Sequence, residues 1–205
     1  MNISDPDCWM KWAKHNDFYK IDLIVHCAAY TDVVQAEIDR QECYDTNVSG
    51  TKYLAETGIP ILYISTEYVF DGKQGDYQEH EPPCPTNFYS LTKLLGEFCL
   101  GYQSKILRFN LKGRPWKYQK AFTDQWTSGD YADVMAKEVD KAITLFPHLP
   151  RITHIGTGRK SVYELAKQTR DVEPMSIHDV DVRLPKDTSL DTRKWEQLKK
   201  EHGLT

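Results

Sequence analysis

One short segment of the chain restricts its fold more than any other. Residues Ile59 to Ile64 form an apolar run directly after Gly58, and the branched side chains in this run are typical of a β-strand covered on both faces. Strands of this kind belong to parallel sheets that carry helices on each side. Thr66 follows the run, so we expect it at the carboxyl end of the strand, where open α/β sheets bind their ligands.

Similar apolar runs recur along the chain and alternate with segments rich in helix-forming residues. We therefore predict an α/β fold, a Rossmann-like parallel sheet flanked by helices. The irregular segment 71–88, rich in Gly and Pro, is expected to border the active site. The predicted strands are residues 23–26, 59–64, 106–109 and 152–155, and the predicted helices lie near residues 6–15, 48–56, 89–101 and 131–146.

A tyrosine and a lysine follow the Ser-Thr strand at helical spacing. Tyr89 and Lys93 are four residues apart, so their side chains share one face of the predicted helix. The ordinary pKa of a phenol is about 10, and a nearby ammonium favours the phenolate and lowers that pKa. With Thr66 hydrogen-bonded to the same oxygen, such a pair can protonate a carbonyl that accepts a hydride. Carbonyl reduction by a nicotinamide cofactor requires these residue types.

The same spacing occurs a second time, at Tyr163 and Lys167. No strand that ends in Ser or Thr precedes this pair at a comparable distance, so we interpret it as an ordinary helix surface. The preceding segment 156–161 lacks the upstream glycine of a phosphate-binding loop. We predict that it is a loop leading into a helix over residues 162–169.

The composition is typical of a cytosolic enzyme. A net charge of -4 and a pI near 6.0 indicate no basic face for nucleic acid. The five scattered cysteines favour a reducing compartment, so we predict a cytoplasmic protein. No metal-binding spacing and no apolar run of membrane-spanning length occurs, so neither a metal nor a membrane partner is predicted. His26 is interpreted as a core residue, and Cys27 is expected to pack rather than to act as a nucleophile.

Four ordered motifs carry a family resemblance. They are residues 22–33 (DLIVHCAAYTDV), 44–51 (YDTNVSGT), 65–72 (STEYVFDG) and 89–93 (YSLTK). Together they resemble the extended short-chain dehydrogenase/reductases, and most closely the dTDP-4-dehydrorhamnose reductase family of sugar-nucleotide reductases. The resemblance implies a Rossmann-like NAD(P)-binding domain over residues 1–110 and a small substrate lobe over residues 111–205, with a late sheet strand near 152–156.

The resemblance also implies a function and a set of site residues. The implied reaction is the NAD(P)H-dependent reduction of a nucleotide-linked 4-keto-6-deoxy sugar, with NADPH or NADH as cofactor. The implied catalytic residues are Thr66, Tyr89 and Lys93. The implied cofactor contacts are Cys27, Ala28, Ala29, Asn47, Ser65, Tyr89 and Lys93, and the implied substrate contacts are Thr66, Tyr68, Phe70 and Tyr89.

The chain also departs from the family pattern. Glu67 replaces the usual Asp, and residues 109–111 (FNL) stand where the family shows Thr-Ser-Trp, which leaves the identity of the sugar open. The family's opening strand, glycine-rich turn and helix bind the cofactor's pyrophosphate, and they have no counterpart here. We therefore expect the strand over 23–26 to be an exposed edge, available to a second copy of the chain or to a separate chain that supplies the missing strand.

Two other functions stay open at this point. One is a non-catalytic sugar-nucleotide-binding or regulatory protein, which keeps the shell of a reductase without cofactor binding. The other is an NAD-dependent sugar-nucleotide epimerase. Basic residues between positions 183 and 194 either meet the phosphates of a nucleotide or are solvated loop charges.

Overall fold

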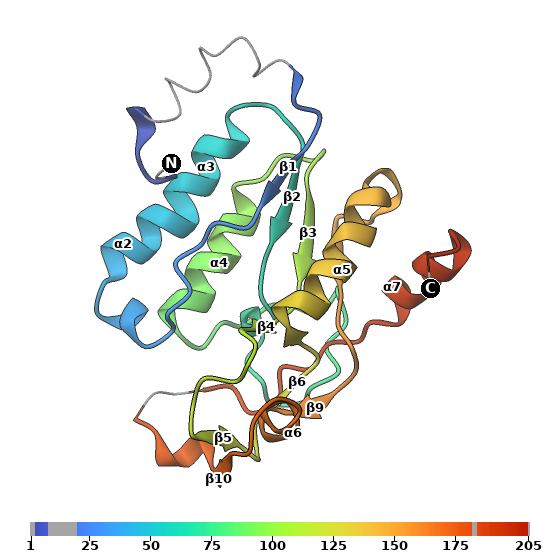
Figure 1. Cartoon of the computed structure of the whole chain (residues 1–205). Helices are drawn as coiled ribbons and strands as arrows, with labels where there is room; N and C mark the ends of the chain where they lie inside the picture. Colours follow the sequence, from blue (N-terminus) through green and yellow to red (C-terminus); the bar gives the residue numbers. More distant parts are fainter. Residues whose placement is uncertain (1–2, 8–19, 182–183, 205) are drawn as a thin grey trace.

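A four-stranded parallel sheet lies at the centre of the computed structural model, which describes residues 3–7, 20–181 and 184–204 (Figure 1). The strands lie in the order β1-β2-β3-β8, so β1 and β8 are the edges of the described sheet. Ile24 of β1 lies opposite Ile61 of β2, and Ile106 of β3 lies opposite Ile152 of β8. The strands are β1 (Ile24–His26), β2 (Ile61–Ile64), β3 (Lys105–Arg108) and β8 (Ile152–His154).

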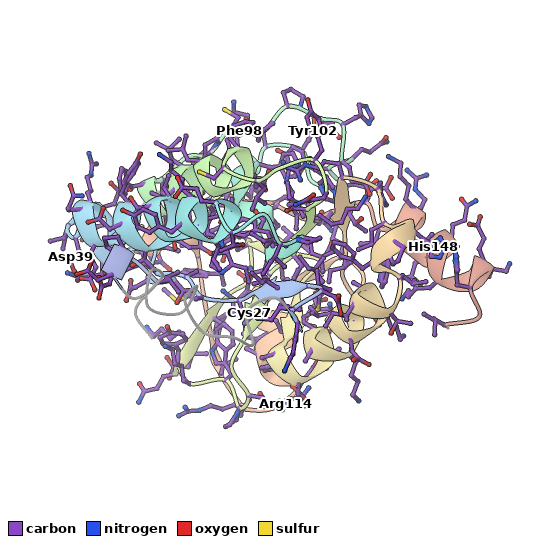
Figure 2. The ribbon with its side chains drawn as sticks, turned by 90° about the horizontal axis from the view of Figure 1, so that it is seen from above. Cys27, Asp39, Phe98, Tyr102, Arg114 and His148 are labelled. Carbon is purple, nitrogen blue, oxygen red and sulfur yellow. The ribbon has the colours of Figure 1, made fainter. Side chains whose placement is uncertain are left out.

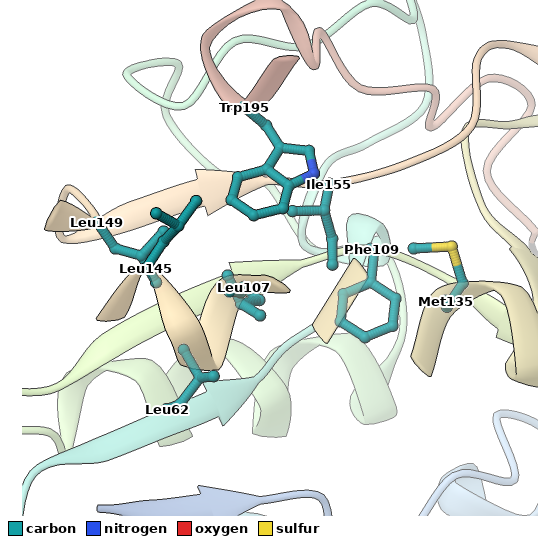
Figure 3. Close-up of a cluster of buried hydrophobic side chains, with 9 residues drawn as sticks. Leu62, Leu107, Phe109, Met135, Leu145, Leu149, Ile155 and Trp195 are labelled. Carbon is teal, nitrogen blue, oxygen red and sulfur yellow. The ribbon is translucent and has the colours of Figure 1, made fainter. Parts of the chain in front are cut away.

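Helices cover both faces of this sheet. They are α3 (Gly50–Ala55) and α4 (Phe88–Phe98) on one face, and α5 (Ala132–Thr144) and α7 (Arg193–Glu201) on the other (Figure 1). Successive side chains of a strand point to opposite faces. Leu62 and Leu107 accordingly pack with Trp195 on the α5 and α7 face (Figure 3). Ile61 and Ile106 belong to a second apolar cluster, on the α3 and α4 face.

The helical segment before β2 is wound unevenly. Helix α2 (Arg40–Tyr44) continues into a π-helical turn, η3 (Asp45–Ser49), and then into α3. Gly96 of α4 lies against this turn, and a Cβ at Gly96 would lie only 2.9 Å from the carbonyl oxygen of Asn47. The absence of a side chain at Gly96 therefore lets α4 approach the turn that carries Asn47.

Short paired strands and one helix form a small lobe beside the carboxyl ends of the central strands (Figure 1). Its apolar cluster contains Trp116, Ala121, Val162 and Ala166. The lobe consists of β4 (Leu111–Lys112) with β7 (Asp130–Tyr131), β5 (Lys120–Phe122) with β10 (Glu173–Met175), β6 (Trp126–Thr127) with β9 (Lys160–Ser161), and α6 (Val162–Lys167). The short remaining turns are η2 (Gln35–Glu37), η4 (Glu67–Val69), η5 (Phe146–His148) and η6 (Ile177–Asp179).

The predicted α/β fold is confirmed, because all four predicted strands are present and parallel. The helices predicted over 48–56, 89–101 and 131–146 are α3, α4 and α5 with slightly different ends, whereas most of the helix predicted over 6–15 lies outside the described residues. Within residues 3–7, 20–181 and 184–204, none of the helices has the length and apolar character needed to cross a bilayer.

In the second Tyr-Lys pair, Lys167 lies on the surface of α6 as predicted, whereas Tyr163 is half-buried against the apolar cluster of the small lobe. Lys167 pairs with Asp171 at 3.3 Å, and their side chains are 47% and 95% exposed. Ser161 accepts a hydrogen bond from the backbone N–H of Glu164, and the Glu164 carboxylate accepts one from the backbone N–H of Ser161. This capping box explains why segment 156–161 ends where α6 begins.

Candidate active site

Thr66 lies just after β2 and directly before the turn η4. Its backbone is extended, and its hydroxyl accepts a hydrogen bond of 3.2 Å from the backbone N–H of Tyr68. This bond fixes the Thr66 side chain at the carboxyl end of β2, where the central sheet meets the small lobe. Thr66 is buried, so its hydroxyl lies in a site largely closed to water.

Helix α4 brings Tyr89 and Lys93 to the same place. The helix begins at Phe88, after Asn87, whose side chain accepts a 2.9 Å hydrogen bond from the Ser90 N–H. The hydroxyl of Thr66 is hydrogen-bonded to the Tyr89 phenol. One helical turn later, the Lys93 ammonium donates a 2.7 Å hydrogen bond to the carbonyl oxygen of Ile64. The three residues predicted as catalytic are therefore neighbours.

The electrostatics of this group differ from the sequence prediction. Burial raises the pKa of Tyr89, and the hydrogen bond from Thr66 only partly opposes that rise. Burial also lowers the pKa of Lys93 to about 7. The prediction that Lys93 brings the pKa of Tyr89 toward neutrality is wrong for this arrangement. Its ammonium is held by Ile64 and lies 4.1 Å from the centre of the Tyr63 ring, and desolvation dominates both pKa values.

Small exposed side chains lie next to this group at the end of β1. Cys27 and Ala28 are both exposed. The prediction that Cys27 packs is therefore wrong, and Figure 2 shows where Cys27 lies. Burial of its sulfur raises the pKa of the Cys27 thiol, and the Lys93 charge lowers it in part. Cys27 therefore lies close enough to Lys93 for the ammonium charge to affect the pKa of the thiol. His26, one residue earlier, is buried and bonded to Thr51 at 2.9 Å, which confirms it as a core residue.

The side chain of Asn47 is hydrogen-bonded to the backbone of the segment that follows β1. Its side-chain oxygen accepts a 2.8 Å hydrogen bond from the backbone N–H of Tyr30, and its side-chain nitrogen donates to the carbonyl oxygen of Tyr30 at 3.1 Å. The same nitrogen donates to the hydroxyl of Thr92 at 2.9 Å. Because Asn47 is 1% exposed, it acts on the neighbouring Ala28 and Ala29 through the backbone of this segment.

Two of the predicted contact residues belong to the interior instead. The hydroxyl of Ser65 donates a 2.5 Å hydrogen bond to the buried Glu97 carboxylate of α4. Phe70 is fully buried, stacked on Tyr77 with ring centres 4.3 Å apart. Phe70 thus packs in the interior of this structure, and its contact with a substrate stays a prediction. Tyr68 is buried too, but its hydroxyl accepts a 3.3 Å hydrogen bond from Gln125 in the small lobe.

Sequence reasoning noted Glu67 only as a departure from the family pattern. In the structure its carboxylate, which is fully buried, accepts hydrogen bonds from Thr127 at 2.6 Å, Thr188 at 2.8 Å and Asn110 at 3.1 Å. Burial raises the pKa of this carboxyl, although these three donors lower it in part. Glu67 thus ties the turn between Thr66 and Tyr68 to three separate segments, and the only sequence signal was an acidic residue inside an apolar motif.

Two basic residues of the carboxyl segment are held in ion pairs. Arg193 pairs with Asp191 at 2.5 Å, and Lys194 pairs with Glu79 at 2.8 Å. Arg183, the other basic residue that begins this segment, lies outside the described residues. For Arg193 and Lys194 the interpretation as loop charges therefore fits the structure better than that as phosphate ligands.

Comparison with known proteins gives the family. Residues 1–111 match the model of the RmlD substrate binding domain family. The chain belongs to this family. The match contains Thr66, Tyr89 and Lys93, so the residues gathered at the end of β2 lie in the part of the chain that defines the family. The resemblance seen in the sequence motifs is thereby confirmed.

Individual members of the RmlD family and related structures extend the comparison. The dTDP-4-dehydrorhamnose reductase of Aggregatibacter actinomycetemcomitans is 37% identical over 129 residues, which are 59% of this chain and 39% of the relative. The spore coat polysaccharide biosynthesis protein SpsK of Bacillus subtilis is 32% identical over 191 residues, which are 81% of this chain and 65% of the relative. The structure of dTDP-4-dehydrorhamnose reductase from Bacillus anthracis in complex with NADP superposes with a TM-score of 0.82 at 25% identity, and the alignment covers 100% of this chain and 82% of that chain. The aligned part of this chain thus spans less than half of the first relative.

Proposed function

We propose that the chain carries the catalytic group of a reductase that uses NADPH or NADH to reduce a nucleotide-linked 4-keto-6-deoxy sugar. The observation that carries this proposal is the contact of Thr66 with Tyr89, next to a buried Lys93. Membership in the RmlD family and the likeness to reductases of dTDP-4-dehydrorhamnose support the substrate class.

The residues present fit the nicotinamide end of such a cofactor. Cys27 and Ala28 are small and exposed at the carboxyl end of β1, so a flat ring and a ribose can approach the backbone there. Lys93 lies beside them, and among the described residues no carboxylate lies within ion-pair distance of its ammonium. In the proposal, Lys93 holds the ribose hydroxyls. When bound, the cofactor supplies the hydride that reduces the carbonyl carbon.

The protein's own contribution is the handling of the proton. Because burial raises the pKa of Tyr89, its phenol stays protonated at neutral pH and can donate to the carbonyl oxygen of the substrate. Thr66 donates its single hydroxyl proton to the Tyr89 oxygen, which orients the phenol so that the Tyr89 proton points toward the carbonyl oxygen. As the carbonyl carbon gains a hydride, the oxygen takes the proton from Tyr89. The resulting phenolate is stabilised by the hydrogen bond from Thr66 until a proton from solvent restores it.

The test is reductase activity of Tyr89→Phe. We expect the purified chain to oxidise NADPH or NADH in the presence of a dTDP-4-keto-6-deoxy sugar, and Tyr89→Phe to lower kcat by about 10²–10⁴-fold, the usual contribution of a positioned acid. The matched control is Tyr163→Phe, which removes the hydroxyl of the surface Tyr-Lys pair and leaves the rate unchanged.

Two results would contradict the proposal. One is calorimetry in which the chain binds neither NADPH nor NADH, which favours a non-catalytic sugar-nucleotide-binding protein. The other is a sugar product that forms without net oxidation of the cofactor, which favours an epimerase.

A further inference from the structure

A carboxylate in the turn η2, which follows β1 in the chain, accepts a hydrogen bond from the first residue of α4. Oε1 of Glu37, in η2, accepts a 2.7 Å hydrogen bond from the backbone N–H of Phe88, where α4 begins. The other oxygen, Oε2, accepts a 2.8 Å bond from Arg40, whose guanidinium lies 5.1 Å from the centre of the Phe88 ring. The first N–H groups of a helix have no partner within it, and the positive end of the helix dipole favours a carboxylate there.

The environment of Glu37 shows that this contact is formed by the charged side chain. The pKa of Glu37 is lowered chiefly by the hydrogen bond from the Phe88 N–H, and then by the bond from Arg40. Glu37 is therefore ionised at neutral pH. The side chain of Glu37 is 36% exposed, so the contact lies at the rim of the molecule rather than in its core.

A second tether joins the same two segments one helical turn further on. Asn47 binds both backbone groups of Tyr30 and also the hydroxyl of Thr92. The two tethers therefore end on Phe88 and Thr92, which directly precede Tyr89 and Lys93 in α4. The segment that begins at the exposed end of β1 is thus fixed to α4 next to each of the residues proposed as catalytic.

We propose that Glu37 is a positioning residue that couples segment 27–37 to the first turn of α4, so that a nicotinamide nucleotide bound along Cys27 and Ala28 tightens the placement of Tyr89. The coupling rests on the proposed function. It also acts in both directions, because a ligand that orders the segment orders the helix start, and an ordered helix start favours binding of that ligand.

The tether itself is tested by amide hydrogen exchange on the full chain without nucleotide. We expect Glu37→Ala to speed exchange of the Phe88 amide and the first turn of α4 by about tenfold, the loss equivalent to one charge-assisted hydrogen bond. Glu37→Gln keeps an oxygen acceptor and recovers most of the protection. The matched control is Glu42→Ala, since Glu42 is an exposed carboxylate of the neighbouring helix α2 and, among the described residues, forms no hydrogen bond or ion pair with α4. Equal exchange in Glu37→Ala and Glu42→Ala would overturn the inference.

The coupling is tested by adding NADPH or NADH. In the wild type we expect the nucleotide to slow exchange both in segment 27–37 and in the first turn of α4, whereas in Glu37→Ala it slows exchange in the segment alone. A positioning role further predicts that Glu37→Ala lowers kcat several-fold more than it raises KM for the sugar nucleotide, with rescue by Glu37→Gln. Equal nucleotide protection of the α4 turn in wild type and Glu37→Ala would refute the coupling. A wild type that shows the nucleotide effect but reduces no sugar would instead refute the proposed reaction alone.

Discussion

Removal of one partner of the Glu97–Arg108 ion pair is expected to destabilise the fold strongly. Arg108 donates to Glu97 from Nε at 2.9 Å and from Nη2 at 2.7 Å, and the two side chains are only 3% and 4% exposed. Ser65 adds a third donor to the same carboxylate. A charge left behind at this depth has little access to water, so the loss of either partner costs about 3–5 kcal/mol.

A double variant separates the destabilisation caused by one unpaired charge from the net contribution of the ion pair to the free energy of unfolding. Arg108→Met leaves the Glu97 carboxylate with only the Ser65 hydroxyl, and Glu97→Leu leaves the guanidinium buried without a counter-ion. Arg108→Met combined with Glu97→Leu removes both charges together with their desolvation penalty. We therefore expect the double variant to cost clearly less than the sum of the single variants, with a coupling of about 2–3 kcal/mol.

Urea unfolding at neutral pH, followed by tryptophan fluorescence, measures each free energy of unfolding. The matched control is Arg114→Met, which breaks the ion pair between Arg114 and Asp133. The side chains of these two residues are 42% and 59% exposed. That change is expected to cost less than about 1 kcal/mol. The reasoning would be refuted if Arg108→Met cost no more than Arg114→Met, or if the costs of Arg108→Met and Glu97→Leu simply added.

Three further outcomes are expected. Burial lowers the pKa of Lys93 to about 7 from its ordinary 10.5, so the folded state favours the neutral amine. The free energy of unfolding of the wild type, measured in urea, should therefore fall relative to that of Lys93→Met as pH falls from about 10 to about 7, by at most about 1.4 kcal/mol per pH unit. A difference that stays constant over this pH range would contradict the argument. Burial lowers the pKa of His26 to about 3 from 6.5, so its contribution is complete above pH 6.5 and is lost as pH falls toward 3; His26→Gln should flatten the acid limb of stability, and an unchanged limb would count against the burial argument. Gly96→Ala should lower the free energy of unfolding by about 1–3 kcal/mol, because the added Cβ would meet the carbonyl oxygen of Asn47. Gly101 has open space around it, so Gly101→Ala should change that free energy by less than about 0.5 kcal/mol. Equal effects of the two substitutions would show that α4 has room to shift.

The sequence was sufficient for the features that depend on local pattern. The apolar run over 59–64 predicted a buried strand because both faces of β2 are covered, and Leu62 and Tyr63 are indeed fully buried on opposite faces. The spacing of Tyr89 and Lys93 placed both on one face of a helix, and α4 brings them to Thr66.

Features that depend on distant partners could not be predicted in this way. The Glu67 carboxylate binds a threonine 60 residues away and another 121 residues away, and no local period connects these positions. The direction of the Tyr89 pKa also failed, because helical spacing gives the distance between two side chains but not the depth at which the helix face is buried. The stacking of Phe70 on Tyr77 could not be predicted for the same reason, since an aromatic residue next to a site motif has the same pattern whether it faces a ligand or the interior.

The apolar cluster around Trp195 has a consequence for the way the chain folds. It unites Leu62 of β2 with Trp195 of α7, so one face of the sheet is completed by a segment far away in the sequence. During synthesis, α5 can cover part of that face of β2 and β3, but the part that packs on Trp195 stays uncovered until α7 has been translated. Folding that depends on such distant contacts is slow, and the waiting intermediate exposes apolar surface. The period between translation of β2 and translation of α7 is therefore the stage at which this chain is most exposed to aggregation and most dependent on chaperones.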